Sequence, residues 1–173
     1  MNILEIAGIE ELFLGLFLIA HGLIHLVFLI YSYDEKSNVY TGWSGRSWLL
    51  DKVVPQSITT YIGKITWTLI MILFVLSGLA VLDILKINEY LTPLIVITSV
   101  IATLAFIIFY NGLSPTPYHW ILGVVINLVF IVFVIVFPNN ISLLIPILIL
   151  IWLWGMFFHT RIIPKTTTYY SLE

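Results

Sequence analysis

Five long apolar runs alternate with shorter polar breaks along the chain. Each run has 18 to 20 residues and contains no Asp, Glu, Lys or Arg. A helix rises about 1.5 Å per residue, so a run of this length covers the roughly 30 Å of hydrocarbon in a bilayer. The pattern predicts five membrane-spanning helices, over residues 12–31, 65–82, 91–110, 120–137 and 141–158.

The breaks contain residues that end helices. Residues 83–90 are short and charged, and Pro115 and Pro117 stop a helix between the third and fourth spans. The sequence Pro-Asn-Asn at 138–140 indicates a tight turn, which makes the last two spans an antiparallel hairpin. We therefore expect one integral membrane domain over 1–173, an all-α polytopic transmembrane bundle of five helices.

Only the connection over residues 32–64 is long. It is too polar to cross a membrane, yet Trp43 and Trp48 stand in it beside Arg46 and Lys52. Aromatic and basic residues together are typical of a segment that lies on the membrane surface with its aromatic side down. We expect this connection to be an amphipathic loop.

The amino-acid composition argues against several classes of protein. The chain is 61% hydrophobic and 9% charged, with a mean hydropathy of +1.10, whereas a soluble domain has about 25% charged residues. The composition therefore argues against a soluble fold, a disordered chain and a nucleic-acid binder. There is no cysteine, which excludes disulfides and thiolate metal sites.

The basic residues are unevenly distributed over the five-span arrangement. The side that holds the first and third loops and the C-terminus has six of the seven Lys and Arg residues, and the other side has Lys86 alone. Cytoplasmic loops are enriched in Lys and Arg, so we expect a multi-pass protein of the cell membrane with its N-terminus outside and its C-terminus cytoplasmic. The six residues are Lys36, Arg46, Lys52, Lys64, Arg161 and Lys165.

Four histidines are the candidate metal or ligand residues. His21 and His25 are spaced i, i+4, so their imidazoles project from one helix face at the spacing of paired metal ligands. Ionisable residues inside a membrane are costly enough to indicate function. His119 and His159 are expected at the cytoplasmic ends of the fourth and fifth spans.

Asn127 is the other deep polar residue. It lies near the depth of His21 and shares a helix face with Trp120. We expect His21 to meet Asn127 across a helix interface, with Asn127 and Trp120 supporting the histidine site.

These residues fit several kinds of site. His21, His25 and one of His119 or His159 match the three protein ligands of a zinc ion that also holds water. Haem is less favoured, because a bis-histidine haem takes its ligands from facing helices and leaves the i, i+4 spacing unexplained. The alternatives are a proton or substrate relay, and interhelical hydrogen bonds with no ligand. No catalytic residue is assigned.

The long loop holds a second candidate site. Arg46 lies in the sequence GWSGRSW, at the expected depth of lipid phosphates. Together with Lys52, Lys64 and Arg161 it predicts a site for an anionic lipid headgroup. The alternative is an interfacial anchor without a bound headgroup.

Three motifs carry a resemblance to known proteins. HGLIHL in the first span, GRSWLL in the loop and HWILGVVINLVF in the fourth span resemble, in this order, a widespread set of small bacterial and archaeal integral membrane proteins. Members carry only generic membrane-protein or permease labels, so the resemblance implies membership and no activity. Asn127 stands where those relatives often have Asp, which weighs against a proton relay at this position.

The leading functional hypothesis is a histidine site, open to the cytoplasmic half of the membrane, that binds a metal ion or a hydrophobic or lipid ligand. The opposing hypothesis is a non-catalytic accessory or structural subunit, and the third is a small carrier or proton relay. The expected partners are the lipid bilayer, a lipid or hydrophobic ligand, and a membrane-protein partner or second copy of the chain.

Overall fold

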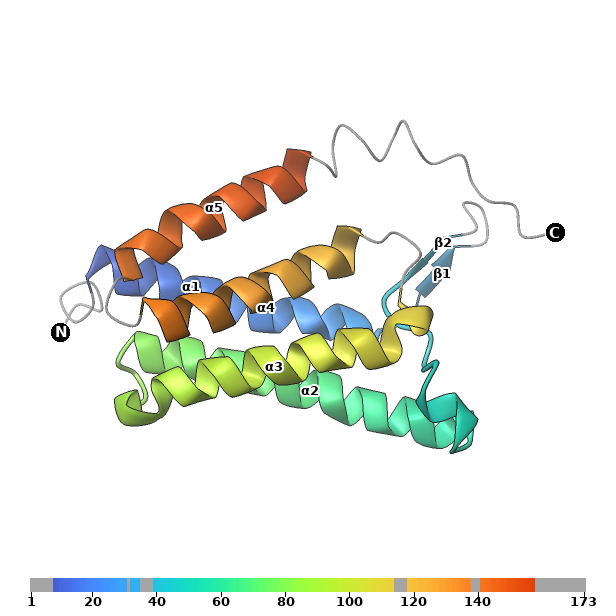
Figure 1. Cartoon of the computed structure of the whole chain (residues 1–173). Coiled ribbons are helices and arrows are strands. Elements are labelled where there is room, and N and C mark those ends of the chain that lie inside the picture. Colours follow the sequence, from blue (N-terminus) through green and yellow to red (C-terminus); the bar gives the residue numbers. More distant parts are fainter. Residues whose placement is uncertain (1–7, 31, 35–38, 114–117, 138–140, 158–173) are drawn as a thin grey trace.

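The computed structural model describes residues 8–30, 32–34, 39–113, 118–137 and 141–157. Within these residues the chain forms five α-helices and a two-stranded antiparallel hairpin (Figure 1). The elements are α1 Ile9–Ile24, β1 Ser32–Asp34, β2 Val39–Thr41, α2 Gln56–Val81, α3 Leu91–Phe109, α4 Tyr118–Val136 and α5 Ile141–Phe157. The helical architecture predicted from the apolar runs is confirmed, and the hairpin is a small addition to it.

In the described part of the chain, three helical stretches are long and apolar enough to cross a membrane, namely Ile9–Leu29, Gln56–Val81 and Leu91–Gly112. The apolar stretches Trp120–Val136 and Leu143–Gly155 are shorter. Many apolar side chains on the outer faces of these helices are exposed, whereas the buried ones meet in one core. This distribution is what a helical bundle needs when its surroundings are apolar.

Helix α1 packs closely on α2 because glycines face each other at the crossing. A Cβ atom built on Gly78 would lie 2.5 Å from the carbonyl oxygen of Gly15. A Cβ atom on Gly22 would lie 2.9 Å from the carbonyl oxygen of Met71. Small residues let helix backbones approach in membrane bundles, so these glycines set the spacing of α1 and α2.

The remaining helices are added around this pair. Helix α3 packs on both α2 and α4, and α5 contacts α1 and α4. In Figure 1, α5 lies on the side of α1 and α4 that faces away from α2 and α3. The core sits between α1, α2, α3 and α4, with Trp67, Phe74, Phe109 and Phe130 among its fully buried side chains. Leu144 and Leu148 of α5 complete it from the fifth helix.

The predicted bounds of two helices need correction. The second helix is predicted from residue 65, but α2 begins at Gln56, directly after Pro55. An apolar run marks only the part of a helix that suits hydrocarbon. The first turns of α2 are more polar and are followed by the exposed, charged Lys64, so they lie outside the apolar run. The first helix begins at Ile9 and its α-helical part ends at Ile24, followed by a 3₁₀ turn over His25–Leu29.

The connection between α1 and α2 is anchored to the bundle by Trp43. This side chain is 3% exposed, and its ring lies 4.9 Å from that of Phe109, centroid to centroid. Its indole N–H donates to the carbonyl of Arg46 at 2.8 Å, and its backbone pairs with Leu113 as a β-bridge. The loop is thus fixed to the end of α3.

Candidate functional site

The backbone geometry at the end of α1 fixes the orientation of His25. The backbone N–H of His25 bonds to the carbonyl of Gly22, because the chain tightens there into the 3₁₀ turn. The His25 ring Nδ1–H donates to the carbonyl of His21 at 2.9 Å. A neutral imidazole has one N–H and one lone pair, so this bond places the lone pair of His25 on Nε2.

The His25 ring is buried among aromatic side chains from three helical segments. The ring centroids of Phe28, Trp67, Phe74 and Phe106 lie 5.8 to 6.0 Å from that of His25. His25 is 1% exposed, and within the described part of the chain its Nε2 has no hydrogen-bond partner. The indole Nε1 of Trp67 is likewise buried and without a partner there.

His21 meets Asn127, as the sequence predicts. The Nε2–H of His21 donates to Oδ1 of Asn127 at 3.0 Å, joining α1 to α4 in the core. Asn127 is fully buried, and its Nδ2 has no hydrogen-bond partner among the described residues. His21 and His25 are adjacent, with ring centroids 5.3 Å apart. The predicted contact is therefore confirmed, while a ligand role for either residue stays a prediction.

Replacing Asn127 with leucine is expected to lower the free energy of unfolding by about 1 to 2 kcal/mol. The change removes an interhelical hydrogen bond and leaves the buried N–H of His21 unpaired. Denaturation in detergent micelles measures the loss, and His21→Leu with the double variant completes a cycle. The double variant should lose less than the sum of the single changes; additive losses would show that the contact does not stabilise the bundle.

The other two histidines are not joined to this pair by any described contact. His119 is the second residue of α4, and its side chain lies outside the described part, as does all of His159. Among the described residues, no group of three His, Cys, Asp or Glu side chains is arranged to hold a metal ion. Trp120 is partly buried and lines a surface groove that also includes Trp48.

The basic loop residues lie at the surface. Arg46, Lys52 and Lys64 are exposed, and Lys52 Nζ lies 5.4 Å from the ring centroid of Trp48, in cation–π geometry. The indole N–H of Trp48 donates to the carbonyl of Ile107 at 2.7 Å, which holds this segment against α3. Arg161 lies outside the described residues. The headgroup site stays a prediction.

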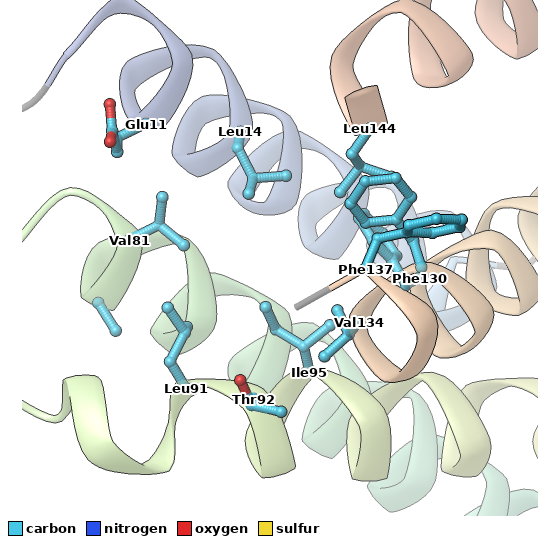
Figure 2. Close-up of a pocket in the computed structure, with 12 residues that line it drawn as sticks. Glu11, Leu14, Val81, Leu91, Thr92, Ile95, Phe130, Val134, Phe137 and Leu144 are labelled. Carbon is cyan, nitrogen blue, oxygen red and sulfur yellow. The ribbon is translucent and has the colours of Figure 1, made fainter. Parts of the chain in front are cut away.

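A cavity of about 250 Å³ lies at the other end of the bundle and was not predicted from the sequence. Figure 2 shows the side chains that line it, which come from all five helices and are mostly apolar. Six of the apolar lining residues are Leu14, Val81, Ile95, Phe130, Val134 and Leu144. Each belongs to an ordinary apolar helix face, so the sequence carries no signal that distinguishes them.

Phe130 connects the cavity to the histidine pair. Its ring lines the cavity and also lies 6.1 Å, centroid to centroid, from the ring of His21. The same ring contacts Phe17 and Phe74 at 6.1 and 6.2 Å. An aromatic layer therefore separates the cavity from the polar cluster.

Comparison of the chain with family models, with curated proteins and with solved structures gives no match in any of the three. The three motifs HGLIHL, GRSWLL and HWILGVVINLVF imply no activity for this chain.

Proposed function

We propose that the chain is a five-span, multi-pass protein of the cell membrane, with its N-terminus outside and its C-terminus in the cytoplasm. Among the described residues, three helices have the length and hydropathy to cross a membrane, and α4 and α5 carry shorter apolar stretches. Three exposed basic residues lie at one end of the bundle: Arg46 and Lys52 in the connection from α1 to α2, and Lys64 near the start of α2. Lys86 lies in the connection between α2 and α3, at the other end. This charge asymmetry supports the orientation.

The function we propose is binding of a small hydrophobic or lipid ligand through its polar group at His25. The observation that carries the proposal is the buried Nε2 lone pair of His25, which has no partner among the described residues. Buried polar groups are nearly always hydrogen-bonded in proteins. The bond from His25 Nδ1–H to the carbonyl of His21 holds the ring so that Nε2 stays an acceptor.

The chemistry around His25 favours a hydroxyl group as the bound group. Trp67 Nε1–H is a donor, buried and unpartnered among the described residues, on the ring 6.0 Å from that of His25. A hydroxyl both donates to a lone pair and accepts from an N–H, which are the two kinds of group that His25 and Trp67 leave without a partner among the described residues. An indole N–H cannot ligate a metal, and a zinc site needs about three protein ligands; a metal ion is therefore the less favoured occupant.

A photoreactive dodecanol analogue tests this proposal on the purified full chain in detergent. We expect cross-links near His25 and Trp67, and roughly tenfold weaker labelling of His25→Phe, the change that about 1.4 kcal/mol of lost hydrogen bonding produces. Trp67→Phe, which keeps the ring and removes the N–H, should label less than the wild type. Trp152→Phe, on an exposed face of α5, serves as the matched control.

Two results would contradict the proposal. Equal labelling of all four proteins would show that the alcohol does not bind at His25. Elemental analysis that finds zinc bound in a one-to-one ratio, or an absorption spectrum with a haem band, would assign the histidines to a metal centre instead.

The bond between His21 and Asn127 favours a second candidate, a structural or accessory subunit. In that case the polar cluster fixes α1 against α4 and binds nothing. A blue native gel of solubilised membranes separates the two candidates. Migration of the chain only within a larger complex, unchanged in His25→Phe, would favour the accessory subunit.

A further inference from the structure

The cavity between the helices has the chemistry of an apolar binding site. The polar lining residues Glu11 and Thr92 belong to the first turns of α1 and α3. The Glu11 carboxylate folds back over Gly8, since a Cβ atom built on Gly8 would lie 2.5 Å from its Oε2. The deeper wall, which includes Phe130, is apolar.

The size and depth of the cavity match a hydrocarbon chain. Its volume is about 250 Å³, and an apolar cavity of roughly 150 Å³ in a protein interior stays dry and binds an apolar molecule. The lining of α4 runs from Phe137, just past its end, to Phe130, a depth of about 10 Å at 1.5 Å per residue. The cavity thus begins at the end of the bundle and extends into it.

We propose that this cavity binds one hydrocarbon chain of a lipid, with the end of the chain against Phe130. Hydrocarbon chains are the apolar molecules that surround a bilayer-spanning bundle. The lining side chains deep in the cavity are apolar, because the polar ones, Glu11 and Thr92, belong to the first turns of α1 and α3 at the end of the bundle. This proposal does not rest on the His25 site, because His25 does not line the cavity.

The experiment uses the full chain in nanodiscs made with phosphatidylcholine that carries a diazirine at the end of one acyl chain. We expect cross-links on the inward-facing wall, at Ile95 and Phe130, which are 5% and 0% exposed. Val134→Phe places a ring in the cavity and should reduce these cross-links roughly tenfold, the effect of about 1.4 kcal/mol. Val136→Phe, the same change on the same helix at an exposed position, should leave them unchanged.

Val81→Phe fills the cavity from α2 and provides a second variant if Val134→Phe does not fold, as judged by circular dichroism. A photoreactive hexadecane added in detergent identifies the source of the chain. Labelling of Ile95 and Phe130 by this alkane shows that a free chain suffices, and labelling by the phospholipid alone shows that the headgroup is required. Wild-type cross-links confined to exposed residues, or equal labelling of Val134→Phe and Val136→Phe, would overturn the proposal.

Discussion

Replacing Gly78 with leucine is expected to lower the free energy of unfolding by roughly 3 kcal/mol, the upper end of overpacking effects. The Cβ atom would lie 2.5 Å from the carbonyl oxygen of Gly15, which belongs to the backbone of α1 and cannot move aside as a side chain can. Helices α1 and α2 would have to separate. His21 lies on α1 and His25 in the 3₁₀ turn directly after it, and both rings pack on side chains of α2. The separation would therefore also open the aromatic layer around the histidines.

The expected loss of stability in Gly78→Leu is opposite in sign to the effect that helix propensity predicts. Leucine favours a helix over glycine by nearly 1 kcal/mol, so local propensity alone predicts stabilisation. Gly155→Leu in α5 is the matched control, because the nearest atoms that its Cβ would meet among the described residues belong to the flexible end of Leu122. Thermal and denaturant unfolding in detergent micelles measure both variants. If Gly78→Leu were as stable as Gly155→Leu, the close approach of α1 and α2 would not determine stability.

Replacing Trp43 with alanine is expected to cost about 3 to 5 kcal/mol, as for other fully buried large aromatics. Trp43 packs on Phe109, donates to the carbonyl of Arg46, and its ring lies against Gly63 and Gly112. Removing the ring leaves a cavity between the loop and the ends of α2 and α3. The loop that carries Arg46 should then detach more readily from the bundle.

Limited trypsin digestion, together with unfolding in micelles, measures this second effect. Cleavage after Arg46 and Lys52 should become faster in Trp43→Ala. Trp152→Ala removes a tryptophan from an exposed position on α5 and should change neither cleavage nor stability. Unchanged cleavage in Trp43→Ala would show that Trp43 does not anchor the loop.

The contact between His21 and Asn127 is the part of the candidate site that the sequence predicted well. Both residues are polar groups at similar depth in apolar runs, and a buried polar group requires a partner. Few other residues at that depth are polar, so the depth and helix face of His21 and Asn127 were enough to predict that they meet. The orientation of His25 was not predictable in the same way, because it depends on where α1 tightens into a 3₁₀ turn.

By itself the sequence determined the helical architecture and the positions of the apolar runs, because hydrophobicity along a run is a local property of the residues. It misplaced the start of α2, since residues 56–64 are helical but are separated from the apolar run by the charged Lys64. Only the tertiary structure decided which side chains surround His25 and that a cavity forms beside Phe130. Both depend on how helices that are far apart in the chain are spaced and crossed. Side-chain packing sets this spacing and crossing, and the residues of a single apolar run do not specify them.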